Sequence, residues 1–448
     1  MSAVDGAERL RKSVHVAAGG FALLLRFIPW WQAALLAGTA LLVNGLALPR
    51  LGGSRLYRAH EHTRGYSAGM LLYPLSILIL ILVFPTRLDI VAAAWAILAA
   101  GDGMASIVGA MVSGPRIPWN REKSVAGTAA LWLCGGLAGA SLAWWCRPTL
   151  NIPPPPWFSL GGPFVAAAAA ALAETMAIRL DDNVTVPFTA AGVLWAGSLI
   201  TADATAAWLP ILLHRLPVGA AVNAAVAYGG FRARTVSISG AIVGAMIGIV
   251  IFAAVGWSGW ALLIATFLAA ASTSRLGLRR KTLLGIAEDR GGRRGAGNAL
   301  ANTGVAAVAA VLAAATPRAE LAAIAFVAAL TAGGSDTVAS EVGKAFGRRT
   351  WMVHTARSVA AGTPGAISLE GTAAGLVAAL ALGSIGAALG LVAVTSLVAI
   401  VAGATVGAFA ESALGATLEH RGVLNNDVLN FLNTGIAAAT AIALVVAW

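Results

Sequence analysis

Residues 88–112 read LDIVAAAWAILAAGDGMASIVGAMV, and this stretch decides the fold class of the chain. It is apolar for longer than the roughly 20 residues that a helix needs to cross a bilayer. Nevertheless it holds a carboxylate well inside it, Asp102, which lies between two glycines. An acidic residue inside such a segment is costly and usually functional. We therefore expect a membrane-spanning helix that carries a polar site.

The composition of the whole chain agrees with a membrane protein. Of its 448 residues, 58% are apolar and 11% are charged, whereas an ordinary soluble domain carries about 25% charged residues. These values exclude a water-soluble globular enzyme, a disordered protein and a nucleic-acid-binding domain of the usual kind. The net charge of +11 is better explained by the basic residues that gather in cytoplasmic loops, so no nucleic-acid partner is expected.

Apolar segments of helical length recur along the chain. They predict an all-α, polytopic membrane protein with about 15 transmembrane segments, because seven segments precede and seven follow a broken apolar stretch that we expect to cross once. The expected segments are 14–29, 31–49, 67–84, 88–112, 125–146, 161–179, 186–201, 203–230, 236–254, 257–272, 298–315, 319–333, 366–382, 385–409 and 429–447.

The positions of Lys and Arg predict which membrane face each loop lies on. If the segments alternate in direction, the main basic clusters fall on one face, which the positive-inside rule assigns to the cytoplasm. The clusters are Arg9/Arg11/Lys12, Arg50/Arg55/Arg58/Arg64, Arg116/Arg121/Lys123, Arg275/Arg279/Arg280/Lys281/Arg290/Arg293/Arg294 and Arg348/Arg349/Arg357. We expect a multi-pass protein of a bacterial-type inner membrane with active sites facing the cytoplasm.

A duplication organises the chain. Residues 101–109 read GDGMASIVG and residues 335–343 read SDTVASEVG, so each has an Asp, then Ala-Ser, then Val-Gly. Further matched motifs follow in the same order in both halves, which chance explains poorly. In both halves the Asp motif is expected around the end of the fourth segment of its set.

The duplication predicts two tandem seven-helix repeats. Because seven is odd, adjoining repeats face the same way only if one further crossing separates them. We therefore expect parallel repeats, with one domain at residues 1–202, a membrane-crossing linker at 203–234 and a second domain at 235–448.

The polar motifs of the first half suit a Mg²⁺-nucleotide on the cytoplasmic side. A carboxylate is a ligand that Mg²⁺ prefers, and basic side chains and helix-start amides bind phosphate. Two further carboxylates could complete a metal site or act as a base for a hydroxyl group. The catalytic candidates are Asp102, Glu174 and Asp182, with Asp102 also a metal ligand, and the nucleotide- or phosphate-binding candidates are Lys12, His15, Arg121, Lys123, Ser124, Gly127, Thr128 and Asn183.

Each of these motifs also has a purely structural interpretation. The glycines around Asp102 suit either a ligand that approaches the backbone or a helix-packing turn. Asp181 is equally well placed to cap the helix that follows it. The basic N-terminal flank with Lys12 and His15 could serve membrane topology alone.

The second half carries a matching but different set. Its catalytic candidates are Asp336, Glu370 and Glu411, its metal candidates are Asp336, Glu341 and Asp427, and its nucleotide- or phosphate-binding candidates are Ser340, Lys344, Arg357, Ser368, Thr372, Asn298 and Asn302. Asn298 and Asn302 share one helix face, where hydrogen bonds within the bundle explain them as well as ligand contact does. Glu370 falls near the place of Lys123 and Ser124, so the phosphate arrangement is expected to differ between the halves.

These motifs resemble two families of lipid kinases. Residues 1 to about 201 resemble the CTP-dependent prenol kinases (phytol, farnesol and dolichol kinases). Residues from about 235 to 448 resemble the phytyl-phosphate kinase family. The first resemblance is carried by RKSVH at 11–15, GDGMAS at 101–106, KSVAGT at 123–128, and Glu174 with Asp182-Asn183. The second is carried by GSDTVASEVG at 334–343 and GTPGAISLEGT at 362–372.

The resemblance implies a fused two-step membrane kinase. The first half would use CTP and Mg²⁺ to phosphorylate an isoprenoid alcohol of the phytol, geranylgeraniol or farnesol class. The second half would convert the prenyl monophosphate to the diphosphate. Two alternatives stay open, namely a CTP-dependent lipid-phosphate cytidylyltransferase and a repeat-built secondary transporter. The prenol chain length, the choice of nucleotide, the role of each carboxylate and the oligomeric state are left open.

Overall fold

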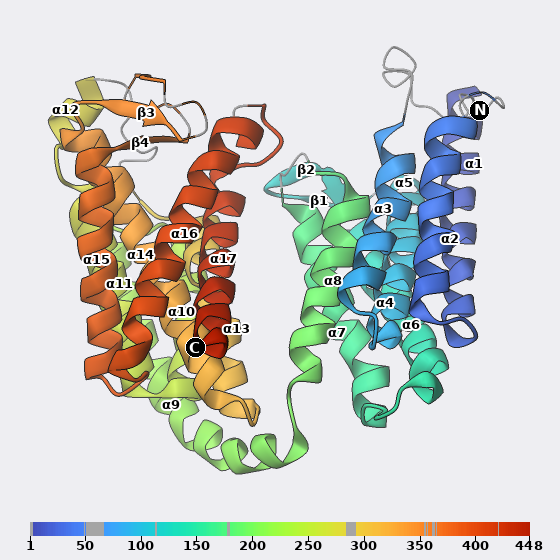
Figure 1. Cartoon of the computed structure of the whole chain (residues 1–448), viewed down its shortest axis with the longest axis horizontal. Coiled ribbons are helices and arrows are strands. Elements are labelled where there is room, and N and C mark those ends of the chain that lie inside the picture. Colours follow the sequence, from blue (N-terminus) through green and yellow to red (C-terminus); the bar gives the residue numbers. More distant parts are fainter. Residues whose placement is uncertain are drawn as a thin grey trace. The chain divides into compact units, whose positions relative to one another are not determined.

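The computed structural model describes residues 3–48, 50, 67–112, 114–176, 180–283, 293–353, 355, 357–360, 363, 365–419 and 421–448, without the side chains of residues 3–10 and 278–280. Some members of the predicted basic clusters therefore lie outside the described side chains: Arg9, Arg55, Arg58, Arg64, Arg279, Arg280 and Arg290. Residues Met1–Leu199 form one compact unit and residues Ile200–Trp448 a second (Figure 1).

The first unit is a helical bundle with one small strand hairpin. Its core centres on α4, where residues 90–94 are at most 1% exposed, because this helix is apolar on every face. The elements are α1 (Ala3–Ala18), the 3₁₀ helix η1 (Gly19–Arg26), α2 (Trp30–Leu42), the π-helix η2 (Val43–Ala47), α3 (Ala68–Val83), α4 (Leu88–Ala96), the π-helix η4 (Ile97–Asp102), α5 (Gly103–Met111), β1 (Arg116–Ile117), β2 (Asn120–Ser124), α6 (Val125–Cys146), the 3₁₀ helix η5 (Arg147–Thr149), α7 (Pro156–Thr175) and α8 (Asp182–Ser198).

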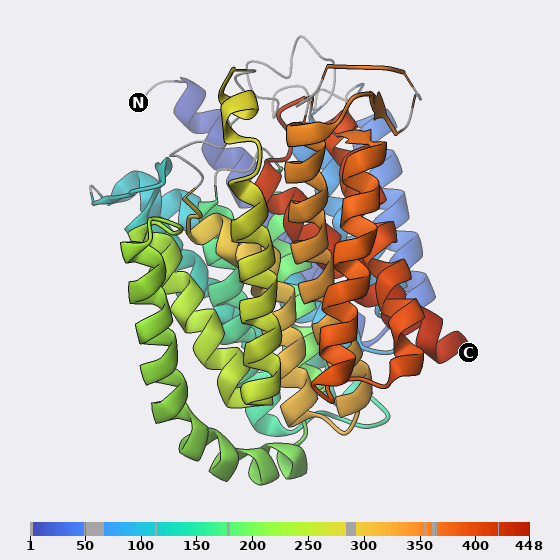
Figure 2. The ribbon, with the colours of Figure 1, turned by 90° about the vertical axis from the view of Figure 1, so that its left-hand side faces the viewer.

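The second unit has the same kind of architecture. Its core centres on α14, where residues 326–330 are fully buried. The elements are α9 (Ala202–Arg232), α10 (Ile238–Val255), α11 (Trp257–Ser274), α12 (Leu278–Leu283), α13 (Ala296–Ala315), α14 (Ala319–Phe346), β3 (Thr350–Met352), β4 (Ala366–Ser368), α15 (Leu369–Ala388), the 3₁₀ helix η7 (Val394–Ser396), α16 (Leu397–Leu414), the π-helix η8 (Gly415–Glu419) and α17 (Asn426–Ala447). Helix α9, which covers most of the predicted linker, packs on α10, and Figure 2 shows α9, α10 and α11 running side by side.

The helices follow the expected segments in order. Every expected segment contains a helix, and 12 helices are long and apolar enough to cross a membrane. Within the described chain, those of segments 14–29, 67–84 and 186–201 are not among the 12. The nearly all-helical membrane architecture is therefore confirmed, while the number of 15 crossings and the parallel repeat stay predictions.

The position of the repeated Asp along its helix differs from the expectation. Helix α14 continues to Phe346, so Asp336 lies inside it and not around its end. Asp102 likewise lies inside one helical run, from Leu88 to Met111. A buried polar residue is tolerated inside such a helix because neighbouring helices supply its partners. These two runs are also the most enclosed ones, since 72% of the apolar stretch is buried in each and 39% or less in the other candidate spans.

The two units share one local packing arrangement around the Ala-Ser and Val-Gly motifs. In the first unit, an added Cβ at Gly127 would lie 2.8 Å from the carbonyl oxygen of Ala105 and 3.5 Å from the Cα of Gly109. In the second unit, an added Cβ at Gly371 would lie 2.6 Å from the carbonyl oxygen of Ala339 and, likewise, 3.2 Å from a glycine Cα. The long helix and the helix after the hairpin thus touch backbone to backbone in both units.

Candidate metal and phosphate sites

Asp102 lies at the end of a π-helical turn, η4, between α4 and α5. Such turns are rare and frequently occur at functional sites. The neighbouring glycines serve packing, because an added Cβ at Gly101 would lie 3.2 Å from Leu131 and one at Gly103 would lie 2.4 Å from Val16. These contacts support the helix-packing interpretation of both glycines, while the Asp102 carboxylate contacts charged partners.

The carboxylate of Asp102 is 6% exposed and contacts two basic side chains of α1. The Lys12 Nζ lies 3.0 Å from Asp102 Oδ2, and the His15 Nε2 lies 3.4 Å from the same oxygen. Tyr73 of α3 fixes this part of α1, because its hydroxyl donates to the His15 carbonyl at 3.3 Å and its ring meets the imidazole edge-on. The side chain of Trp95 in turn donates to the Tyr73 hydroxyl at 2.8 Å.

A second basic side chain, Lys123 of β2, links two further carboxylates. Its Nζ lies 2.5 Å from Glu174 Oε1 at the end of α7 and 3.0 Å from Asp182 Oδ2 at the start of α8. Although burial by itself would lower it, the carboxylates of Asp182 and Glu174 raise the pKa of Lys123 above its ordinary value. Burial raises the pKa of Asp182, and the Lys123 ammonium opposes that shift. Lys123 therefore carries its charge at neutral pH.

The three carboxylates converge from different helices. Asp102, Glu174 and Asp182 each offer an oxygen, and these oxygens lie within 4.8 Å of one another. Oxygen donors at such separations suit Mg²⁺. We name this group, with Lys12, His15 and Lys123, the first-unit cluster. Sequence reasoning found all six residues, which the fold brings together from five elements.

The other first-unit candidates mostly serve the backbone. Ser124 caps α6, since its Oγ accepts the Gly127 N–H at 3.1 Å, so this helix-start amide is already used. The Thr128 hydroxyl donates to the Ser124 carbonyl at 3.1 Å. Arg121 is exposed on β2. Asn183 donates to Asp181 Oδ1 through both its backbone and its side chain, which confirms the capping interpretation of Asp181.

The second unit encloses a cavity of about 410 Å³ between α13, α14, α15, α16 and α17. Its charged lining is mixed in sign: Arg294, Asp336, Glu341, Lys344, Glu411 and Glu419. Asp336 and Glu411 lie close enough for their carboxyl groups to interact both by charge and by a hydrogen bond. The Glu411 Oε2 is buried without a hydrogen-bond partner among the described residues. A buried oxygen of this kind ordinarily has a partner, and a cation or a hydrogen-bond donor would supply one.

A buried ion pair adjoins this cavity. The Lys281 Nζ lies 2.5 Å from Glu341 Oε2, both side chains are 2% exposed, and Lys344 approaches the other carboxylate oxygen at 3.4 Å. The Lys281 ammonium also donates to the Ser274 carbonyl at 2.7 Å. Both oxygens of Glu341 thus face ammonium groups, which favours a structural role over the predicted metal ligation. The sequence predicts Lys281 only as one of the basic residues on the cytoplasmic face. Nothing in the neighbouring sequence indicates that its side chain is buried.

The remaining second-unit candidates divide into two groups. Those that line the cavity are Asn298, Ser340, Ser368 and Thr372, in addition to the charged residues above. Ser368 also caps α15 by accepting the Gly371 N–H at 3.1 Å. Asn302 donates to the Asn298 carbonyl at 3.0 Å, a bond within α13 that joins no second helix, so the predicted hydrogen bonding between helices is not tested by it.

Like Asn302, three further candidates are not among the described residues that line the cavity. Glu370 accepts the Arg348 backbone N–H at 3.4 Å. Arg357 is exposed after β3. Asp427 lies against α13, where an added Cβ at Gly297 would lie 2.1 Å from its Oδ2.

Comparison with known proteins gives a family match for part of the chain. Residues 221–438 match the family model described as "Integral membrane protein DUF92". The chain is 38% identical over 202 residues to "Uncharacterized membrane protein sll0875" of Synechocystis sp., which covers 44% of this chain and 78% of the relative. No solved structure matches.

Two plant proteins are also similar to parts of the chain. "Protein VTE6, chloroplastic" of Arabidopsis thaliana is 33% identical, with 46% of this chain and 64% of the relative covered. "Probable phytol kinase 3, chloroplastic" of Glycine max is 34% identical, with 30% of this chain and 41% of the relative covered. The chain thus spans less than two thirds of each of these two proteins. The family match and the Synechocystis relative together identify the chain as a member of the DUF92 family of integral membrane proteins.

Proposed function

We propose that the first unit transfers a phosphoryl group from a nucleoside triphosphate, CTP, to an isoprenoid alcohol. The observation that carries this proposal is the first-unit cluster, in which three carboxylates within 4.8 Å of one another alternate with Lys12 and Lys123. Phosphoryl transfer needs such a set, because catalysis rests on positioning and on charge stabilisation. The name of the relative from Glycine max, a probable phytol kinase, supports an isoprenoid alcohol as the acceptor.

The donor set fits Mg²⁺. Asp102, Glu174 and Asp182 would hold the ion, since hard cations of this size take carboxylate oxygens. When bound, Mg²⁺ supplies positive charge against the phosphate oxygens. Lys12 and Lys123 contact the same carboxylates. We infer that both ammonium groups turn to the phosphates once the carboxylates are otherwise engaged.

In the proposed reaction, the γ-phosphoryl group moves from CTP to the prenol hydroxyl at the first-unit cluster. The oxygen of the prenol hydroxyl forms a bond with the γ-phosphorus, the bond to the β–γ bridging oxygen breaks, and CDP leaves. The hydroxyl proton passes to one of the carboxylates of the cluster, which acts as the general base. Lys12 and Lys123 balance the charge that develops on the leaving group. The prenyl tail stays among apolar helices, where it is soluble.

The second unit is proposed to phosphorylate the resulting prenyl monophosphate to the diphosphate. An acceptor that already bears a phosphate needs additional positive charge, and Arg294 and Lys344 line the cavity beside Asp336 and Glu411. Asp336 and Glu411 would take the parts that the carboxylates take in the first unit. The resemblance of this half to the phytyl-phosphate kinases supports the assignment.

Purified protein with Mg²⁺, CTP and a panel of prenols tests both steps. We expect prenyl monophosphate and diphosphate, with release of CDP. Release of pyrophosphate and formation of a CDP-lipid would identify a cytidylyltransferase instead. Replacement of CTP by ATP, GTP or UTP measures the nucleotide preference. If no nucleotide is consumed with any prenol or prenyl phosphate, the kinase assignment is wrong, and transport in proteoliposomes becomes the next assay.

A further inference from the structure

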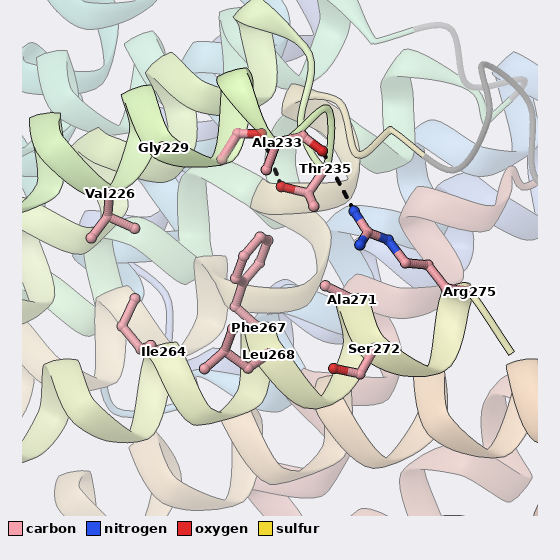
Figure 3. A pocket seen from close by; sticks show the side chains of 11 residues that line it. Val226, Gly229, Ala233, Thr235, Ile264, Phe267, Leu268, Ala271, Ser272 and Arg275 are labelled. Carbon is pink, nitrogen blue, oxygen red and sulfur yellow. Dashed lines mark hydrogen bonds between the residues drawn. The ribbon is translucent and has the colours of Figure 1, made fainter.

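The second unit has another hollow besides the cavity lined by Asp336 and Glu411, which we name the mixed-charge cavity. This other hollow is a groove of about 540 Å³ between the C-terminal part of α9 and α11, and Figure 3 shows it from close by. At one end are Val226 and Ile264, and at the other are Thr235 and Arg275, with the Phe267 ring between the two helices. We name it the α9–α11 groove.

Most side chains that line this groove are apolar, so we expect an apolar occupant. Val226 and Leu268 are 38% and 55% exposed, and both lie in candidate membrane spans. A void beside such side chains forfeits the dispersion contacts that a hydrocarbon chain would make. From Ile264 to Arg275 the groove follows α11 for three turns, about 16 Å. A hydrocarbon tail that lies along the helix fills this shape.

The polar end of the groove suits an anionic head. Arg275 donates to the Ala233 carbonyl at 3.5 Å, which is a long contact that uses one of the five N–H donors of its guanidinium. The hydroxyl of Ser272 and the residue Thr235 lie at the same end. Arginine pairs with phosphate in a two-pronged geometry, so the end of the groove complements a phosphate.

The groove also adjoins the mixed-charge cavity. The Arg294 backbone N–H donates to the Thr235 carbonyl at 3.0 Å, while Arg294 also lines the cavity. The Arg294 side chain donates to the Ser274 Oγ at 3.3 Å, next to Arg275. Arg294 thus contacts Thr235, which lines the groove, and itself lines the cavity. This continuity favours the lipid that the cavity consumes over a bulk phospholipid.

We propose that the α9–α11 groove binds prenyl monophosphate, with the tail along α11 and the phosphate at Arg275, before the phosphate enters the cavity at Arg294. The proposal rests on the proposed second kinase step for the identity of the lipid. It assigns Arg275 and the groove walls as substrate-binding residues that determine affinity, and not as catalytic residues.

Photolabelling tests the groove without turnover. The probe is a prenyl monophosphate with a diazirine at the end of its tail, added to the full chain in detergent or nanodiscs without nucleotide. We expect labelled peptides from 226–235 and 264–275, and protection by unlabelled prenyl monophosphate. Equal protection by phosphatidylglycerol would identify a general lipid site, and labelling elsewhere in the chain would place the tail elsewhere. Either result overturns the proposal.

Kinetics with matched variants add a second readout. Ala271→Trp fills the groove, and Met246→Trp adds the same bulk at an exposed position of α10 outside it. Arg275→Gln removes the charge, and Arg232→Gln removes a charge at the end of α9 that does not line the groove. We expect both groove variants to raise the KM for prenyl monophosphate at least tenfold, with kcat and the KM for nucleotide within twofold of the parent. Equal values for groove and control variants would overturn the proposal.

The two failures are distinguishable. If the groove is labelled but no diphosphate forms under any condition, the second kinase step is wrong and the lipid site stands. If diphosphate forms but the groove is not labelled and its variants behave as the parent, the kinase step stands and the groove proposal is wrong.

Discussion

Lys12 lies 3.0 Å from Asp102, although 90 residues separate them in the chain. The pair joins the first helix of the unit to the π-helical turn at its centre. A buried carboxylate without such a partner would be strongly disfavoured. The same relationship recurs around Lys123, which meets Glu174 and Asp182. Each buried carboxylate of this cluster therefore has a basic partner within the helical bundle.

Asp102→Asn should abolish most of the first step. The change keeps the shape of the side chain but removes a preorganised charge, whose loss costs roughly 10²–10³ in kcat for groups of this kind. We expect monophosphate formation from prenol to fall by at least that factor, while diphosphate formation from added monophosphate continues. Product analysis with labelled CTP measures both.

A matched control lies on the same helical run. Asp89 is also buried, 2% exposed, but it pairs with Arg87 at the other end of α4, at 2.9 Å. Asp89→Asn should weaken folding without a selective effect on either step. If Asp89→Asn lowers the first step as much as Asp102→Asn does, the loss reflects destabilisation and the site assignment is unsupported.

Lys12→Met separates nucleotide binding from prenol binding. A charge-assisted hydrogen bond contributes about 1.5–3 kcal/mol, so we expect the KM for CTP to rise about 10- to 100-fold. The KM for prenol should change little, since the tail lies among apolar helices. A rise in both KM values together, or in neither, would contradict a direct contact between Lys12 and phosphate. Lys12→Arg keeps the charge and should restore part of the affinity.

The sequence predicts the helices and the first-unit cluster well, because both rest on strong signals. Apolar length marks each helix, and the repeated order of rare polar residues marks the site. The sequence is a poor guide where the role of a residue depends on neighbours that are far from it in the chain. Glu341 resembles a ligand in its motif, yet it faces Lys281 across the bundle. Gly101 and Gly103 suit a ligand loop equally well until the positions of α6 and α1 are known.

The ion pair of Lys281 and Glu341 can be tested for a structural role. Removal of one partner leaves a buried charge, which costs about 3–5 kcal/mol, so Glu341→Met should strongly lower the free energy of unfolding in detergent. The double variant with Lys281→Met should regain most of it, because an apolar pair of similar volume is tolerated there. We expect the double variant to retain the second step. A folded double variant that has lost this step would restore Glu341 as a metal ligand.

The serine caps of α6 and α15 should contribute equally in the two units. Ser124 and Ser368 each accept a glycine N–H at 3.1 Å, and loss of such a cap costs about 1 kcal/mol. We expect Ser124→Ala and Ser368→Ala to lower the free energy of unfolding by that amount each. Ser141→Ala is the control, since its hydroxyl is exposed and bonds only within α6. A large loss of activity without loss of stability would instead favour phosphate contact by the serines.

Asp336→Asn should impair the second phosphorylation and leave the first intact, whereas Asp102→Asn should do the reverse. Asp336 and Glu411 line one cavity, and an amide at position 336 keeps the shape of the side chain and can still hydrogen-bond to Glu411, so the variant should fold about as well as the parent. The second step loses a preorganised carboxylate, and prenyl monophosphate should therefore accumulate from prenol and CTP. Glu320→Gln is the control, because it changes an exposed acidic residue in the first turn of the same helix. Chromatography of the lipid products over time measures the ratio of monophosphate to diphosphate. An unchanged ratio in a folded Asp336→Asn variant would show that the cavity of the second unit does not carry the second phosphorylation.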